Sequence, residues 1–199
     1  LVGENFKYGI NPPTTGTSDP TDDSSNFSTG NPWFDASQVT ISNGTINVSK
    51  ATTVAAQNVG YNLSNQPLGG FEVEVKGEAI QVSSSAYHFQ ITGTTGQVED
   101  ITNITLVYEN GTIVGGPVDG SGAAIFGTAT FSDTITFPIG KHTYTLKGKL
   151  GTDFLNNQTV VASTTPSSDW TSTGQVTGNS ISETPTSAVS GNTMTVKTG

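Results

Sequence analysis

The sequence predicts an all-β fold, an antiparallel β-sandwich, on three observations. Val, Ile and Thr make up 62 of the 199 residues, against only seven Leu, and side chains branched at Cβ pack better on a pleated sheet than in a helix. Apolar and polar residues alternate along short segments separated by 24 Gly and nine Pro. No segment carries a 3.6-residue apolar period long enough to predict a helix. The apolar share of 32% suits a sandwich, because alternate strand positions are free to be polar.

The first predicted strand is an extension that precedes the sandwich. Within residues 1–10, Phe6, Tyr8 and Ile10 stand at period two, which indicates a half-buried strand. The dipeptide Pro12-Pro13 ends this segment, because proline cannot donate a hydrogen bond to a ladder. These three apolar side chains are candidate anchors for self-assembly, since a strand outside the sandwich can add to the sheet of a neighbouring copy.

A polar linker separates this strand from the main body. Residues 14–31 are nearly all Thr, Ser, Gly, Asp and Pro, which is typical of a flexible or semi-extended connection. We therefore divide the chain into an N-terminal strand and linker over residues 1–37 and a β-sandwich over residues 38–199.

Two Asn-Gly dipeptides predict hairpins. Asn43-Gly44 lies at the centre of residues 39–48, where a two-residue type I′ turn would place Ile41 opposite Ile46. Asn110-Gly111 stands between two further alternating segments in the same way. The remaining strands are expected within residues 69–77, 85–93, 103–109, 126–140 and 141–150, with shorter pieces near 159–162, 174–181 and 193–197.

The order of these segments resembles a known domain. GGFEVEVKGEAIQVSSSAYHFQITGT, EDITNITLVYENGTIVGG, GTATFSDTITFPIGKHTYTLKGKL and SGNTMTV follow one another as in an immunoglobulin-like domain that repeats in large bacterial surface and surface-layer-like proteins. The similarity covers roughly residues 38–199. It implies an immunoglobulin-like antiparallel β-sandwich with an extracellular structural or adhesive role, and it brings no catalytic residues with it.

Charge and composition exclude several classes of partner. The net charge is −9, and all seven positive charges are Lys, so the chain lacks the Arg that makes bidentate phosphate contacts and is not expected to bind nucleic acid. No apolar run approaches the roughly 20 residues of a membrane span, so membrane insertion is not expected. Without an initiator Met or a leader, Leu1 is expected to begin a processed or excerpted chain.

The titratable residues show no catalytic pattern. His88 and His142 fall on predicted strands, without a nucleophile and an orienting acid at a recognisable spacing. Glu72 and Glu74 are two residues apart on the polar face of a strand, where solvated charge is the ordinary explanation for a carboxylate pair. We therefore expect a protein that is not an enzyme.

Two groups of residues are candidates for binding. Asp19, Asp22 and Asp23 form the densest acidic cluster and are candidate Ca²⁺ ligands, although the cluster lacks an EF-hand pattern and is better explained as a solvated linker, so no cofactor is expected. Trp33, Trp170 and the tyrosines are candidates for a sugar-stacking platform, although two Trp in a sandwich more often cover the edges of the core.

Seven N-x-S/T sequons are candidate N-glycosylation sites, which would mark a protein exported from the cell. Composition alone accounts for most of them, because Ser and Thr together supply 54 of the 199 residues. The asparagines are Asn26, Asn43, Asn47, Asn62, Asn103, Asn110 and Asn157.

Together these features predict an extracellular or cell-surface protein with a structural function. We expect a subunit of a homopolymer, a surface filament or a surface layer, that assembles by donation of its N-terminal strand to the next copy. The alternative is an adhesin or carbohydrate-binding module of a larger surface protein, with glycans as partners.

Overall fold

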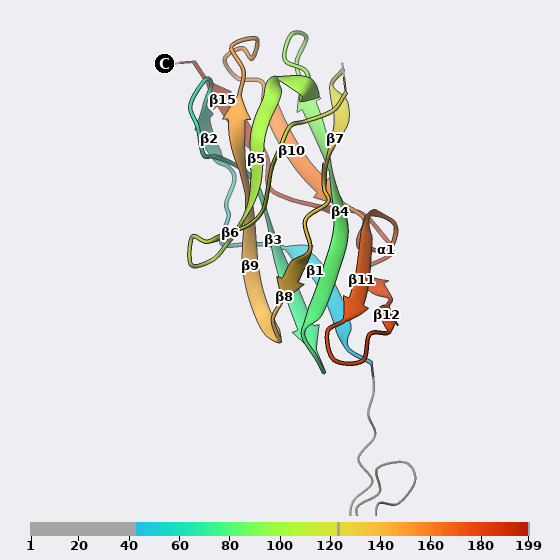
Figure 1. Cartoon of the computed structure of the whole chain (residues 1–199). Coiled ribbons are helices and arrows are strands. Elements are labelled where there is room, and N and C mark those ends of the chain that lie inside the picture. The colour runs from blue at the N-terminus through green and yellow to red at the C-terminus, as the bar shows by residue number, and fades with distance from the viewer. Residues whose placement is uncertain (1–42, 123, 199) are drawn as a thin grey trace, which may run out of the picture. The chain divides into compact units, whose positions relative to one another are not determined.

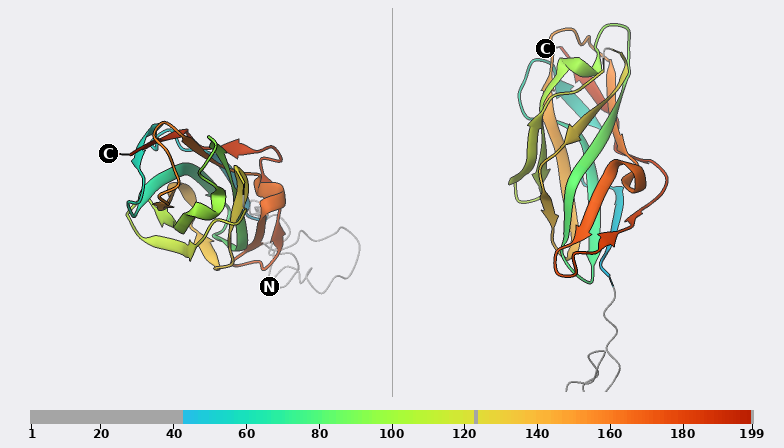
Figure 2. Two further views of the ribbon diagram at one scale, coloured as in Figure 1. Left: turned by 90° about the horizontal axis from the view of Figure 1, so that it is seen from above. Right: turned by 45° about the vertical axis from the view of Figure 1, so that its right-hand side comes forward.

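The computed structural model describes residues 43–122 and 124–198, which form a β-sandwich of two facing sheets (Figures 1 and 2). The predicted all-β sandwich is confirmed. Its strands are mostly antiparallel, as expected, but two parallel pairs make both sheets mixed. The predicted extension strand and linker of residues 1–37, and Trp33 with them, lie outside the described residues. In the described part of the chain, no helix is long and apolar enough to span a membrane.

The first sheet has six strands. Their spatial order is β13 (Glu183–Thr184), β1 (Thr45–Lys50), β3 (Gln66–Lys76), β9 (Gly140–Leu150), β5 (Ile101–Tyr108) and β6 (Ile113–Val118). All pairs are antiparallel except β1 with β13.

The second sheet has nine strands arranged around the long strand β4. The main path is β12 (Ser180–Ile181), β11 (Trp170–Gly174), β4 (Ile80–Thr92), β10 (Thr159–Thr164), β15 (Met194–Lys197) and β2 (Gln57–Gly60). Strand β14 (Val189–Ser190) pairs with β10, while β7 (Phe126–Phe131) and β8 (Ile135–Phe137) pair with the other edge of β4. A 3₁₀ turn, η1 (Val98–Asp100), and the single-turn helix α1 (Pro166–Asp169) complete the chain.

The core lies between the sheets and follows the predicted alternation. In β3, Phe71, Val73 and Val75 are buried and the residues between them face outward. The same alternation buries Tyr87, Phe89 and Ile91 of β4, and Tyr144 and Leu146 of β9. Period two therefore identified the buried face of β3, β4 and β9, because one face of an antiparallel sheet packs on the core while the other meets solvent. Strand β5 departs from the alternation, since four consecutive residues, 104–107, are buried.

The predicted hairpin at Asn110-Gly111 is confirmed, with a loop one residue longer than expected. Strands β5 and β6 pair across it. Tyr108 N–H donates to the carbonyl of Thr112 (2.8 Å), and Gly111 N–H donates to the carbonyl of Tyr108 (2.8 Å). Gly111 has φ +91°, which matches a three-residue loop that ends with a glycine in the left-handed region.

The predicted hairpin over residues 39–48 is wrong. Gly44 lies outside the positive-φ region that a type I′ turn requires. Both edges of β1 are occupied by distant segments, because Ile46 stands opposite Val75 on one side and Glu183 on the other. Glycine is needed at position 44 for a different reason: a Cβ there would lie 2.9 Å from Cγ of Glu78. Long-range pairing thus overrides the local turn signal.

Candidate functional site

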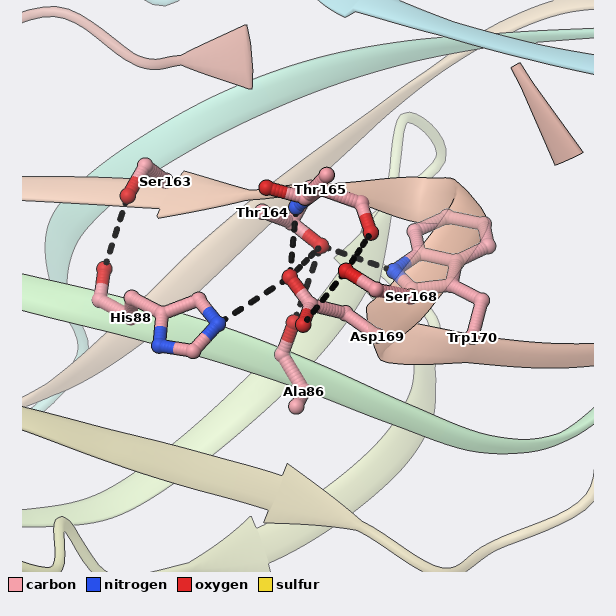
Figure 3. Close-up of polar contacts among 8 residues, drawn as sticks. All are labelled: Ala86, His88, Ser163, Thr164, Thr165, Ser168, Asp169 and Trp170. Carbon is pink, nitrogen blue, oxygen red and sulfur yellow. Dashed lines mark hydrogen bonds and ion pairs between the residues drawn. The ribbon is translucent and has the colours of Figure 1, made fainter. Parts of the chain in front are cut away.

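A polar network around Asp169 contains the first of the two histidines (Figure 3). Asp169 ends α1, where Pro166 at the first helical position leaves Thr165 as the N-cap. The Asp169 carboxylate accepts the Thr165 N–H and contacts the Nε2 atom of His88 on β4 at 3.0 Å. It also accepts the hydroxyl of Ser168 at 3.4 Å. The carboxylate therefore holds the turn between β10 and β11 closed.

Thr164 joins this network to the core. Its hydroxyl donates to the carbonyl of Ala86 (2.9 Å) and accepts the indole N–H of Trp170 (2.9 Å) (Figure 3). Trp170 is only 5% exposed and stacks on Phe137, with ring centroids 5.3 Å apart. Trp170 is therefore a core residue and presents no face on which a sugar ring could stack.

Replacing Thr164 with Val is expected to destabilise the sandwich by about 1–3 kcal/mol, because the change keeps the volume but leaves the Trp170 N–H and the Ala86 carbonyl without this partner in a buried site. Urea unfolding monitored by tryptophan fluorescence would measure the difference. Thr171→Val, at an exposed strand position, is the matched control and should change stability by less than about 0.5 kcal/mol. An equally small effect at Thr164 would contradict the bridging role.

Among the described residues, neither histidine has the set of partners that acyl-transfer chemistry needs. A triad requires a hydroxyl or thiol on one imidazole nitrogen and an acid on the other. His88 has its acid in Asp169, but the nearby Ser163 hydroxyl contacts only the backbone carbonyl of His88, at 3.5 Å. Within residues 43–122 and 124–198, no serine or threonine hydroxyl bonds to an imidazole. The contact between His88 and Asp169 joins strand β4 to the α1 turn.

The second histidine ties the β5–β6 loop to β9. His142 Nδ1 lies 2.8 Å from the hydroxyl of Tyr108 and 2.9 Å from Oε1 of Glu109. The other Glu109 oxygen accepts the Thr143 N–H at 3.1 Å. The hydrogen bond with His142 lowers the pKa of Glu109, whereas burial raises the pKa of Tyr108. This cluster fixes a loop at the edge of the six-stranded sheet.

A buried carboxylate that the sequence analysis did not identify holds together the end of the sandwich where β1 begins. Glu78, 7% exposed, lies in the turn between β3 and β4. It accepts the N–H groups of Val176 (2.7 Å) and Thr177 (2.9 Å), the Thr177 hydroxyl (2.7 Å) and, at 3.4 Å, the Gly44 N–H. These bonds, with the Thr177 hydroxyl first, lower the pKa of Glu78 to about 2. The sequence signal for this site is slight: an acid directly after Gly77 that interrupts the alternation of β3.

The described sequons all place their asparagine on the surface. Three of these residues have positive φ: Asn62 and Asn157 lie in turns, and Asn103 lies at an irregularity within strand β5. The exposed sequon asparagines are Asn43, Asn47, Asn62, Asn103, Asn110 and Asn157. Exposure is necessary for glycosylation, which stays a prediction at these sites.

The other predicted site residues fall outside the described residues. These are Phe6, Tyr8 and Ile10 of the assembly strand, the candidate Ca²⁺ ligands Asp19, Asp22 and Asp23, and the sequon at Asn26. Within the described ranges, no three His, Cys, Asp or Glu side chains are grouped to hold a metal ion.

The free edges of the two sheets are short and partly capped. In the described part of the chain, the longest strands that pair with only one other strand are β6 and β7, with six residues each, and β6 is an outermost strand of the first sheet. Its Gly116 N–H donates to Asp133 at 2.7 Å, and the next residue, Pro117, has no N–H to offer. At the edge strand β2, the Gly60 N–H donates to the Gln66 side chain at 2.9 Å. Such capping limits unprogrammed pairing between copies.

No protein-family model matches the chain, and no curated protein matches it. The resemblance to a repeat domain of bacterial surface proteins therefore stays a prediction.

Three solved structures show partial similarity to the fold. A non-cellulosomal cohesin from the archaeon Archaeoglobus fulgidus is 12% identical, with 79% of this chain and 93% of that chain covered and a TM-score of 0.34.

Self-complemented MyfA, the major subunit of Myf fimbriae from Yersinia enterocolitica, is 14% identical, with 77% and 98% covered and a TM-score of 0.25. AvmM, which catalyses macrocyclization in alchivemycin A biosynthesis, is 8% identical, with 79% and 90% covered and a TM-score of 0.34. All three TM-scores are below 0.5, so these likenesses say nothing about what this chain binds or catalyses.

Proposed function

We propose that this protein is a non-enzymatic structural subunit of an extracellular homopolymer, in which the strand predicted at residues 4–10 adds to the sheet of the next copy. The observation that carries the proposal is the completeness of the core. Large side chains such as Phe71, Phe89 and Phe131 are at most 1% exposed. They belong to one hydrophobic cluster, whose buried members come from strands throughout residues 46–196. A further apolar strand is therefore surplus to the core of its own sandwich.

The length of the linker supports donation to a neighbour. Eighteen residues at roughly 3.3 Å each reach about 60 Å, longer than an ordinary sandwich domain. The proposed acceptor is the first half of the outer edge of β6, residues 113–115, which precedes the capped Gly116 and Pro117. Ile113 in this half is 57% exposed and offers an apolar contact. A head-to-tail contact of this kind is heterologous and does not close on itself, so its repetition produces a filament.

The competing function is an adhesin or carbohydrate-binding module. One of the two tryptophans proposed for sugar stacking does not support this function, because Trp170 is buried in the core. A polysaccharide array incubated with the purified full chain separates the two functions, since a structural subunit should bind copies of itself and no particular glycan.

Deleting residues 1–11 tests the proposal. We expect the full chain to sediment as filaments visible by electron microscopy, and the deleted chain to stay monomeric with an unchanged melting temperature, because its core is complete. Unchanged assembly after the deletion would overturn strand donation.

A matched pair of variants makes the test specific to the apolar face of the strand. Phe6→Ser with Tyr8→Ser removes two predicted anchors and should raise the critical concentration for assembly at least about 10-fold. Lys7→Ser with Gly9→Ser alters the opposite face and should change it less than about 2-fold. Equal effects of the two double variants would contradict a strand that inserts one face into a neighbour.

A further inference from the structure

The lysines of the sandwich gather on the outer face of the six-stranded sheet. The described residues contain six lysines, and four of them occupy outward positions of the adjacent strands β3 and β9. In β9 the buried Leu146, Gly148 and Leu150 alternate with the outward-facing lysines. The four lysines are Lys76, Lys141, Lys147 and Lys149.

Two of these four lysines form ion pairs with acidic residues of the sandwich. Lys141 pairs with Glu72 at 2.6 Å, and Lys76 pairs with Glu74 at 3.0 Å. Lys147 and Lys149 make no ion pair within the described ranges. Their cross-strand neighbours on β5 are the uncharged Thr105 and Thr102. One end of this face therefore carries two adjacent positive charges, about 7 Å apart along one strand.

The complementary charge lies in the N-terminal part of the chain. Residues 1–42 contain five acids and one lysine, and three of the acids stand within five positions at Asp19, Asp22 and Asp23. Asp19 is nine residues beyond Ile10, a reach of up to about 30 Å. A copy that accepts residues 4–10 is therefore within reach of the acidic cluster of the same donor.

We propose that Asp19, Asp22 and Asp23 of one copy dock on Lys147 and Lys149 of the copy that accepts its strand. This inference rests on the proposed function and adds a second contact to it. Exposed ion pairs contribute about 0.2–1 kcal/mol each, so two of them strengthen assembly only modestly. Their main effect is to orient the linker across the six-stranded sheet, because complementary charge selects one register among several.

Zero-length carbodiimide crosslinking of the assembled full chain tests the contact. Copies with ordinary and ¹⁵N-labelled nitrogen are mixed before assembly, so that mass spectrometry separates crosslinks between copies from those within one copy. We expect crosslinks between residues 19–23 of one copy and Lys147 or Lys149 of another. Filaments that lack these crosslinks, or that carry them only within one copy, overturn this inference and leave the proposed function intact. Absence of filaments overturns both.

Charge variants provide the second measurement. Lys147→Gln with Lys149→Gln should raise the critical concentration for assembly about 2-fold to 30-fold at low salt, by the energies of two exposed pairs, and about 0.5 M NaCl should remove the difference. Lys76→Gln with Lys141→Gln removes the same charge from the same face and should have at most half that effect on a logarithmic scale. Equal effects of the two double variants would mean that only net charge matters, and would overturn the docking site.

Discussion

Replacing Trp170 with Ala is expected to lower the free energy of unfolding by about 3–5 kcal/mol, the cost of removing a large aromatic side chain from a packed core. The indole stacks on Phe137 and meets the ring of Tyr87 edge-on, with centroids 6.1 Å apart. The truncation also removes the N–H donor that the Thr164 hydroxyl accepts. Urea unfolding monitored by circular dichroism measures the change.

Two further variants separate the parts of this effect. Trp170→Phe keeps an aromatic ring on Phe137 but removes the N–H, so it should retain much of the stability and report the loss of volume and of the hydrogen bond. Phe126→Ala truncates an aromatic residue that is 59% exposed and should cost less than about 1 kcal/mol. A loss below about 1 kcal/mol for Trp170→Ala would show that the indole is not part of the core.

Replacing Glu78 with Gln is expected to destabilise the sandwich at neutral pH and to have progressively less effect in acid. Hydrogen bonds lower the pKa of this carboxyl from 4.5 to about 2 in the folded protein. As pH falls from 4.5 towards 2, the unfolded chain takes up a proton at Glu78 that the folded chain refuses. The stabilisation from Glu78 is therefore complete above pH 4.5 and is lost as the pH approaches 2.

Melting temperatures measured from pH 7 to pH 2 test this expectation. The gap between the wild-type protein and Glu78→Gln should be widest at neutral pH and should narrow below pH 4.5, because glutamine does not titrate. Glu109 also has a lowered pKa, but it is present in both proteins and cancels. Glu99→Gln, at an exposed position, is the control and should show no such gap. A gap that stays constant to pH 2 would mean that the charge of Glu78 does not stabilise the fold.

The strands β3, β4 and β9 were predictable because each buries one face on a single core. The alternation of Phe71, Val73 and Val75 needs no knowledge of the partner strand, since period two alone separates the two faces. The Asn110-Gly111 turn was predictable for a similar reason, because both of its strands are neighbours in sequence. Short edge strands such as β13, with two residues, carry too little pattern to be seen in the sequence.

Contacts between segments that are far apart in the chain could not be predicted from the sequence. The donors to Glu78 at Val176 and Thr177 lie 98 and 99 residues along the chain, and no local pattern connects them. The incorrect hairpin at Asn43-Gly44 has the same origin, because the turn signal was sound locally but β1 pairs with β3 and β13 instead. The network around Asp169 likewise depends on β4 and β10 being neighbours.

The parallel pairing of β15 with β2 has a mechanical consequence. Strand β1 begins near one end of the sandwich, and the chain leaves β15 at the other end (Figure 1). A pull between these two points acts along the strands, so β15 must slide past β2, which it meets at four residue pairs from Met194–Gln57 to Lys197–Gly60. The hydrogen bonds of this ladder resist such a pull together, in shear, whereas a strand peeled from its end would break them one at a time. All the hydrogen bonds between β2 and β15 therefore oppose tension along the chain at the same time.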